Sequence, residues 1–245
     1  MSTHNKAIGT YKESSLHRTL KFQYSGRGGR IETQAGGYIA DGMNALGELI
    51  EVQTGSFAPL KAKVKEFVCF SRVRIIHPVA INKHIEVFEA RSGVKPIYRR
   101  KSPVKGSVWN LFDALLFAPE LPLIPGVSIE VVLVSIVEKR VRDGRGSWRR
   151  KGVSIMDREL VTWHESVVLE KKSDYLQFVP FEKNEIFTSS ELVEKTGIDA
   201  DLARKALYVL TKLKVVERIG KEGRRWLYKR INVKKAANRN TASCP

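Results

Sequence analysis

Two acidic residues near the start of the chain have the type and spacing of metal ligands. Asp41 ends the short apolar stretch 38–41, and Glu51 stands inside a second stretch, 48–54. If both stretches are neighbouring strands, Glu51 and Gln53 share one face of their strand and lie beside Asp41. Two carboxylates and an amide supply the hard oxygen atoms that Mg²⁺ or Mn²⁺ prefers. The sequence therefore predicts a divalent-metal site here.

Three further charged residues belong to the helices expected before and after these two stretches. Glu13 lies on the inward side of the first expected helix, which spans residues 13–24. Lys61 and Lys63 belong to a helix that we expect to start near Pro59, and both border its apolar side. A lysine beside a reacting phosphate would stabilise the negative charge of a transition state.

Each of these residues also has a plainer interpretation, which the sequence leaves open. Asp41 could be a turn former, Glu51 a solvated strand residue, and Glu13 a first-turn carboxylate favoured by the helix dipole. Lys61 and Lys63 could be solvated or could bind phosphate. Isolated histidines without a Cys/His cluster are interpreted as structural residues: His17, His77 and His164.

Charge is the strongest signal in the composition. The chain has 43 Lys and Arg against 26 Asp and Glu, a formal net charge of +17. A polyphosphate releases condensed cations when lysine and arginine replace them, so nucleic acid is the first partner to consider. An anionic membrane surface or an acidic protein could also attract such a chain.

The same sequence favours a soluble protein. No apolar run reaches the roughly 18–20 residues of a membrane span. Residues 1–12 are polar and lack the apolar core of a secretory signal. We therefore expect no membrane span and a cytoplasmic location.

Near the C-terminus the sequence predicts two helices followed by a hairpin. Thr188 and Ser189 precede acidic residues and Gly197 follows, which is typical of a helix start and a helix end. A second helix has an apolar stripe from Leu202 to Leu213, and residues 215–228 alternate around a glycine-containing turn. Basic residues of this region are candidate nucleic-acid contacts: Arg204, Lys205, Lys221, Arg224 and Arg225.

The chain between these regions is predicted to be rich in strands. A basic loop, 96–106, holds three more candidate nucleic-acid contacts, Arg99, Arg100 and Lys101, and leads to a helix over 107–117. We expect four parts: a core over 1–95, a basic α/β extension that packs on it over 96–175, a helical unit over 176–233, and a disordered tail over 234–245. Strands are expected at 73–81, 84–90, 128–140 and 157–170.

The first part resembles the PD-(D/E)XK nuclease superfamily in Asp41 and Glu51-Val52-Gln53. That resemblance implies a restriction-endonuclease-like α/β (α+β) fold in which Asp41 and Glu51 hold Mg²⁺ or Mn²⁺, with a metal-binding glutamate on the first helix at Glu13. Gln53 departs from the family pattern, which has lysine there. A lysine from the following helix replaces it in some members, so Lys61 and Lys63 are candidates.

The C-terminal part resembles the winged helix-turn-helix family. That resemblance implies that its second helix enters the major groove of DNA while the hairpin contacts the backbone. Together the two resemblances predict a metal-dependent DNA endonuclease acting on duplex or branched DNA. The alternative is a non-catalytic DNA-binding regulator, a role consistent with Gln53. RNA as the target and a homodimer also stay open.

Overall fold

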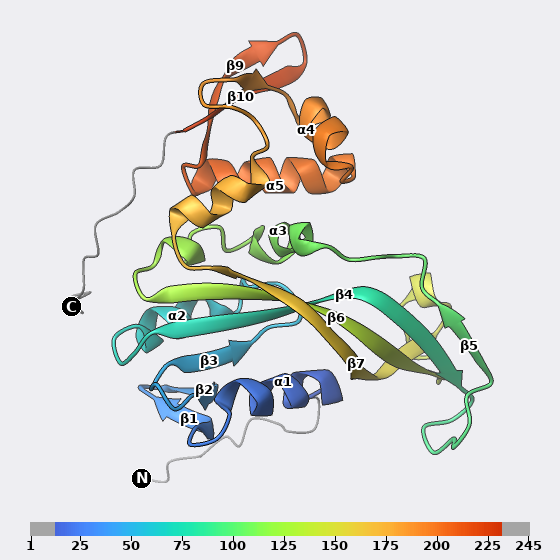
Figure 1. Cartoon of the computed structure of the whole chain (residues 1–245). Helices are drawn as coiled ribbons and strands as arrows, with labels where there is room; N and C mark the ends of the chain where they lie inside the picture. Colours follow the sequence, from blue (N-terminus) through green and yellow to red (C-terminus); the bar gives the residue numbers. More distant parts are fainter. Residues whose placement is uncertain (1–12, 232–245) are drawn as a thin grey trace, which may run out of the picture.

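The computed structural model describes residues 13–231 and is a mixed α/β structure built on one large sheet (Figure 1). The strands follow the order β1-β2-β3-β4-β6-β7, and β5 pairs with the outer part of β4. The pairs β3–β4 and β4–β6 are parallel, and the other pairs are antiparallel. The strands are β1 (Arg30–Ala35), β2 (Tyr38–Met43), β3 (Leu49–Val52), β4 (Val73–Phe88), β5 (Tyr98–Lys101), β6 (Val127–Arg142) and β7 (Val153–Leu169).

The long central strands differ from the predicted organisation. Residues 96–175, expected as an extension packing on the core, instead contribute β6 and β7 to the same sheet. The two strands expected at 73–81 and 84–90 are one strand, β4, whose register against β6 shifts between Ala80 and Asn82. Such a bulge interrupts the alternation of apolar residues, which is why the sequence indicates two strands.

One face of the sheet is covered by helix α1 (Ser15–Ser25), which places Leu16 and Leu20 against a core that includes Ile50 of β3. The helix begins at Ser15 rather than at Glu13, because the Ser14 side chain accepts the backbone N–H of His17. A Cβ at Gly42 would overlap Ser25 Oγ, so only glycine lets α1 approach β2 this closely.

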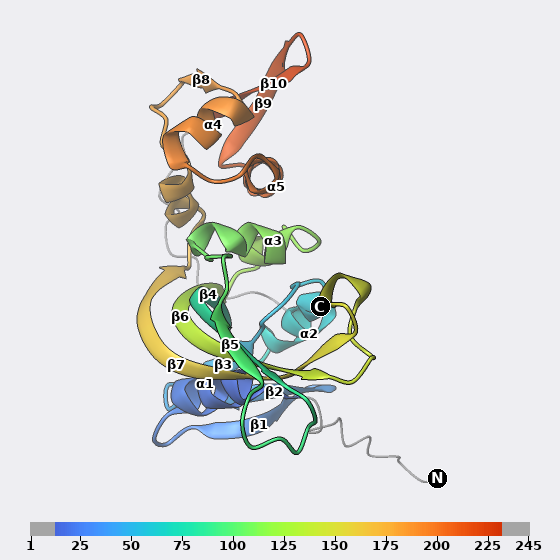
Figure 2. The ribbon, with the colours of Figure 1, turned by 90° about the vertical axis from the view of Figure 1, so that its right-hand side faces the viewer.

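The opposite face is covered by helix α2 (Leu60–Phe67) and by a 3₁₀ turn, η2 (Val108–Asn110), that continues into α3 (Leu111–Leu115). Figure 2 shows α1 and α3 on opposite sides of the curved sheet. Two predicted helices are confirmed. Pro59 is the N-cap of α2, and η2 with α3 lies within the helix expected over 107–117. The central strands β3 and β6 are therefore buried along most of their length, whereas β1, β5 and much of β7 are not.

The C-terminal unit has the helices and hairpin that the sequence predicts. Thr188 caps α4 (Ser189–Thr196) together with Glu191, and Gly197 ends that helix with a φ of 71°. Helix α5 (Ala200–Lys212) follows, and a small sheet has the order β8-β10-β9. Its strands are β8 (Ile186–Phe187), β9 (Val216–Glu222) and β10 (Arg225–Arg230).

This unit is attached to the main sheet through a shared core. Buried residues of α5 belong to the same apolar cluster as those of α3. The connecting 3₁₀ segment η5 (Lys172–Phe178) adds Phe178, which makes edge contacts with Trp109 and Phe112. The expected boundary at residue 176 falls inside η5.

Two expectations concern the ends of the chain and membranes. The predicted tail, 234–245, and the polar residues 1–12 lie outside the described residues. Within residues 13–231, no helix combines the length and the apolar composition needed to cross a bilayer.

The core between α1 and the sheet gives a test of the fold. Leu20 is fully buried there, whereas Phe22 on the same helix is 53% exposed. We expect Leu20→Ala to lower the free energy of unfolding by about 2–5 kcal/mol, since it removes apolar contacts and leaves a cavity. The matched change Phe22→Ala should cost about 0.5 kcal/mol or less. Equal losses in urea titrations of the two variants would contradict this packing.

Candidate functional site

The residues of the candidate site meet where β2 and β3 separate. The strands are paired at Gly42–Ile50 and Met43–Leu49. Beyond these pairs, side chains bridge the gap: the Asp41 N–H donates to Glu51 Oε1 over 3.1 Å, and the Val52 N–H donates to Asp41 Oδ2 over 2.8 Å. Each carboxylate thus satisfies a backbone N–H of the other strand. We call Asp41 and Glu51 the β2–β3 fork.

Helix α2 contributes one lysine to the fork. Lys63 Nζ lies 2.7 Å from Glu51 Oε1, and the Glu51 side chain is only 4% exposed. Lys61, two positions earlier, is turned to another side of the helix, where its Nζ lies 2.8 Å from Glu120 Oε1. Of the two candidate lysines, the structure therefore brings Lys63 to the carboxylates.

Helix α1 contributes a histidine that the sequence analysis assigned to a purely structural role. His17 Nε2 lies 3.1 Å from Asp41 Oδ2 and 3.5 Å from Glu13 Oε1. Lys21 Nζ lies 3.1 Å from the same oxygen of Glu13. Glu13 precedes the helix instead of standing in it, and it contacts the fork residue Asp41 through His17. The spacing of four residues between Glu13, His17 and Lys21 was the signal that could have revealed this row.

Burial and charge give the two fork carboxylates different pKa values. Burial, with the nearby negative charge of Asp41, raises the pKa of Glu51 to about 7, although Lys63 opposes the change. Burial also acts to raise the pKa of Asp41, but the hydrogen bond and charge of His17 outweigh it and lower that pKa. The fork therefore holds two carboxyl groups that repel each other when both are ionised.

Gln53 does not take the expected position beside the carboxylates. Strand β3 ends at Val52, and the Gln53 side chain turns to donate to the backbone oxygen of Ser56. Its own backbone oxygen lies 2.7 Å from His77 Nδ1. The prediction that Gln53 and Glu51 share a face assumed a strand longer than the one observed.

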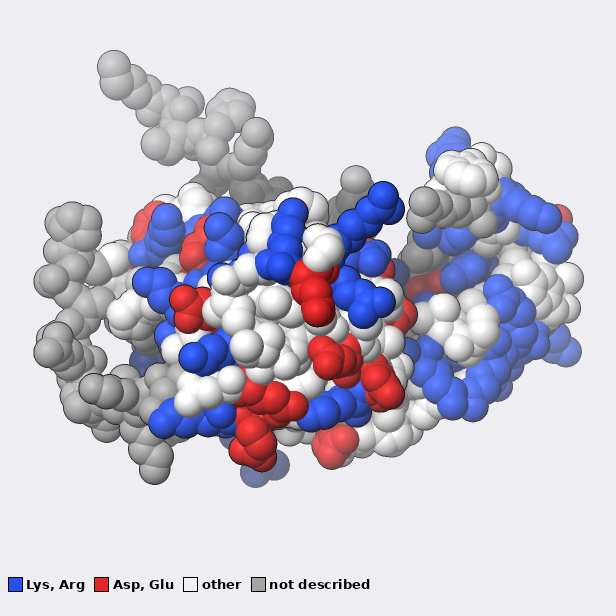
Figure 3. Space-filling model, turned by 90° about the horizontal axis from the view of Figure 1, so that it is seen from above, with Lys and Arg blue, Asp and Glu red and all other residues white. Residues whose placement is uncertain are grey.

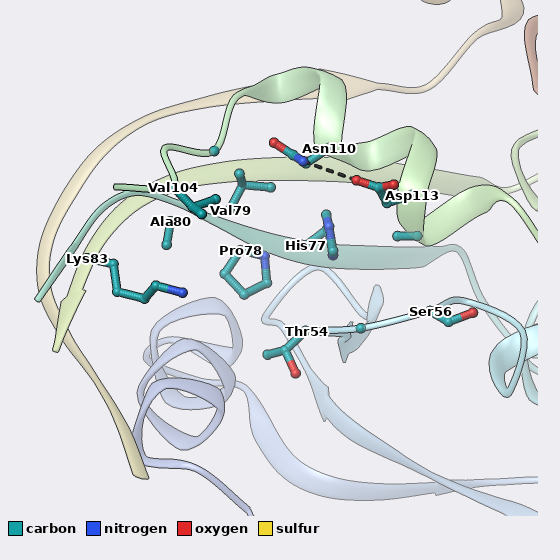
Figure 4. A pocket seen from close by; sticks show the side chains of 13 residues that line it. Thr54, Ser56, His77, Pro78, Val79, Ala80, Lys83, Val104, Asn110 and Asp113 are labelled. Atoms are coloured by element: carbon teal, nitrogen blue, oxygen red, sulfur yellow. Dashed lines mark hydrogen bonds between the residues drawn. The ribbon is translucent and has the colours of Figure 1, made fainter. Parts of the chain in front are cut away.

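A cavity of about 320 Å³ lies beyond the end of β3, between β4 and α3 (Figure 4). His77 lines it and packs edge-on against Phe57. Burial lowers the pKa of His77, although the hydrogen bond to Gln53 opposes this. Asn110 of η2 and Asp113 of α3 face the cavity, and Asn110 donates a 3.1 Å hydrogen bond to Asp113. These contacts agree with the structural role expected for His77.

The first group of candidate nucleic-acid contacts lies far from the fork along the sheet. Arg99, Arg100 and Lys101 are exposed on β5, where Arg99 Nε lies 3.6 Å from Glu86 Oε1. Figure 3 shows Lys and Arg side chains crowding the right-hand end of the molecule, where Figure 1 places β5. This end of the sheet is strongly basic.

The candidate contacts in the C-terminal unit fall into two groups. On α5, Lys205 lies 2.8 Å from Asp113 Oδ1 of α3 and 2.6 Å from Asp201 Oδ2, and these partners raise its pKa. Lys205 therefore joins α5 to α3, whereas Arg204 is exposed. The second group, Lys221, Arg224 and Arg225, is exposed at the tip of the β9–β10 hairpin.

Within residues 13–231, no group of three or more His, Cys, Asp or Glu side chains is arranged to hold a metal ion. The fork supplies two carboxylates, with Glu13 held away from them by His17. Mg²⁺ is commonly bound by one or two carboxylates while water and substrate phosphates complete its shell. The donor set of the fork fits that mode of binding and not a site made of protein atoms alone.

The fold and the site define a mixed α/β protein with a carboxylate–lysine–histidine cluster at a strand fork and a small basic C-terminal unit. The chain belongs to the family described as "Domain of unknown function (DUF8091)", whose model matches residues 14–170. This span includes every fork residue.

One curated relative is an uncharacterized protein of Treponema pallidum (strain Nichols). It is 29% identical over 224 residues, which cover 91% of this chain and 87% of the relative. The similarity therefore extends past residue 170 into the C-terminal unit. No solved structure matches the chain.

The raised pKa of Glu51 predicts how stability changes with pH. Glu51 holds its proton up to a pKa of about 7 in the folded protein, against about 4.5 for a glutamate free in water. Its contribution to stability is therefore present below about pH 4.5 and is lost as the pH rises through about 7. Glu51→Gln removes this loss, so the variant should gain about 1–3 kcal/mol relative to the unchanged protein between about pH 4.5 and 8. Urea unfolding in chelator measures the free energy of unfolding of both proteins across this pH range. A stability difference between them that does not change with pH would contradict the prediction.

Proposed function

We propose that the chain is a divalent-metal-dependent nuclease that hydrolyses phosphodiester bonds at the β2–β3 fork. The observation that carries this proposal is the meeting of Asp41, Glu51 and Lys63, which come from two strands and a helix. Two carboxylates beside one lysine are suited to hold a cation and a phosphate together. The resemblance of Asp41 and Glu51-Val52-Gln53 to the PD-(D/E)XK pattern supports the same chemistry and a restriction-endonuclease-like fold.

The chemistry of the donor set favours Mg²⁺ or Mn²⁺ as the cofactor. Both fork carboxylates offer hard oxygen atoms, and a divalent cation would relieve the repulsion that raises the pKa of Glu51. When bound, such a cation supplies Lewis-acid stabilisation of a phosphate oxygen and a more acidic water molecule.

The residues around the fork have separate roles in this proposal. Asp41 and Glu51 would hold the cation, and both are fixed in place by backbone N–H groups. Lys63 provides a positive charge that can stabilise the negative charge growing on a phosphate, the role that lysine has at the position of Gln53 in the family. His17 orients Asp41 through Oδ2, and Glu13 in turn holds His17. His17 and Glu13 are therefore positioning residues.

We further propose that the C-terminal unit is a winged helix that binds DNA. Its elements follow the order β8-α4-α5-β9-β10, and β10 lies between β8 and β9 in the sheet. Three basic side chains are exposed at the hairpin tip, and a net charge of +17 favours a polyphosphate partner. Arg99, Arg100 and Lys101 on β5 offer a second set of phosphate contacts.

A non-catalytic DNA-binding regulator is the second candidate, and one observation favours it. Gln53 replaces the family lysine, and its side chain is bound to Ser56 instead of facing the fork. The two candidates differ in cleavage and agree in binding. Incubating the protein with labelled duplex, branched and single-stranded DNA, with Mg²⁺, Mn²⁺ or chelator, separates them.

Substitutions at the fork test the catalytic assignment. We expect Asp41→Ala and Glu51→Ala to abolish cleavage, because each removes a metal ligand, while DNA binding in chelator is unchanged or slightly tighter. Lys63→Ala should reduce the cleavage rate by roughly 10²-fold or more, the scale of a lost electrostatic stabiliser. Lys65→Ala, exposed on the same helix, is the matched control and should stay within about 2-fold. Cleavage that survives in both carboxylate variants would exclude the fork.

The hairpin tip can be tested through the salt dependence of binding. Replacing Lys221, Arg224 and Arg225 with Ala should weaken duplex binding and reduce the slope of log K against log salt by roughly 2–3, because fewer cations are released. Fluorescence anisotropy over a salt series measures both quantities. An unchanged affinity and slope would remove the hairpin from the interface.

A further inference from the structure

We propose that a groove between α5 and the end of α3 binds an unpaired nucleic-acid strand by stacking a base on exposed aromatic rings. The groove has a volume of about 380 Å³. Its walls are formed by Tyr208 and Lys212 of α5 on one side and by the segment 116–120 that follows α3 on the other, with Lys61 of α2 at the edge. The inference rests on the proposed function, because it assigns a substrate class to the same enzyme.

The aromatic side chains of the groove are unusually open to solvent. Phe117 is 66% exposed and Tyr208 is 40% exposed, although both stand next to well-buried elements of the core. A base can stack on an aromatic ring whatever its identity, since every base has a π-face. Two exposed rings that line one base-sized groove therefore provide a platform for an unpaired strand.

The charges around the rings complement a nucleic-acid backbone. Lys212 Nζ lies over one face of the Tyr208 ring, 5.7 Å from its centre, so a base stacked on the other face would have its phosphate near a lysine. Glu120 also lines the groove as a carboxylate, and the charge of Lys61, whose Nζ lies 2.8 Å from Glu120 Oε1, balances its negative charge. Lys65 adds further positive potential at Glu120. The balance of charge favours an anionic strand.

The groove and the fork are connected through α2. Lys61 lines the groove, and Lys63, two residues further along α2, contacts Glu51. Residues two apart lie on different sides of a helix whose diameter is roughly 10 Å. A strand held in the groove therefore needs only a few nucleotides to pass around α2 and reach the fork. This places the substrate among nucleic acids that carry an unpaired end or flap.

The packing of α5 leaves only one side of this helix open, which limits how a DNA duplex could bind to it. One side of α5 is occupied by the rest of the protein. Lys205 contacts Asp113 of α3, and Leu202 and Val209 are buried in the core. After the first turn of α5, the exposed residues are Arg204, Tyr208 and Lys212, and the last two form part of the groove wall. A narrow groove admits a single strand more readily than a duplex.

The test compares binding of single-stranded and duplex probes in chelator, so that it does not depend on cleavage. We expect Tyr208→Ala and Phe117→Ala each to weaken binding of labelled oligothymidylate by roughly 10-fold, the scale of one lost stacking contact, while duplex affinity changes by less than about 2-fold. Tyr208→Phe keeps the ring and should bind like the unchanged protein. Phe70→Ala, which removes an aromatic side chain 62% exposed outside the groove, is the matched control.

The outcomes separate this proposal from the nuclease assignment. Oligouridylate is run beside oligothymidylate, and stronger loss with one of them identifies RNA or DNA as the strand that the groove prefers. If the Tyr208 and Phe117 variants lose no more single-strand affinity than Phe70→Ala, or lose duplex affinity equally, the groove is not a stacking site. If the Tyr208 and Phe117 variants behave as expected but the unchanged protein cuts no substrate, the nuclease proposal fails, whereas the proposal that the groove binds a single strand is supported.

Discussion

The separation of β2 from β3 determines what the candidate site can do. In a fully paired ladder, Asp41 would project toward α1 and Glu51 toward α2, on opposite faces of the sheet, because their neighbours Ala40 and Ile50 are buried in different cores. Where the strands part, both carboxylates enter the gap and each accepts a backbone N–H from the other strand. Two carboxyl groups are thereby held side by side in a mostly buried position, which is why the pKa of Glu51 is raised.

That arrangement is stable because each layer of the fold supplies a compensating cation or donor. Helix α1 brings His17 to Asp41, and helix α2 on the other face brings Lys63 to Glu51. Parallel pairing of β3 with β4, and of β4 with β6, anchors the fork on the buried centre of the sheet. Truncating a core residue such as Leu20 would therefore loosen the support of His17 as well as the fold.

Local signals in the sequence predicted local structure well. The Thr188 cap and Gly197 define α4, and long alternation defines β6 and β7. The parallel pairing of β4 with β6 could not be read from the sequence, because strands about fifty residues apart leave no mark of their partner. The sequence predicted the site residues Asp41, Glu51 and Lys63, because two strands close in sequence and the helix after them are expected to lie side by side. His17 was missed because its partner Asp41 lies 24 residues away, and Gln53 was misplaced because β3 is short.

The position of α5 decides which surfaces of the C-terminal unit stay open to a partner. Its Lys205 is bound to Asp113, so one side of the helix is committed to α3 and cannot lie in a major groove while that contact lasts. What stays open is the side with Arg204 and Lys212, together with the tip of the β9–β10 hairpin. Lys212 on that side lines a groove together with Lys61 of α2, and α2 also carries Lys63 to the fork. The contact between α5 and α3 therefore holds the C-terminal unit beside the same helix that supplies the fork with its lysine.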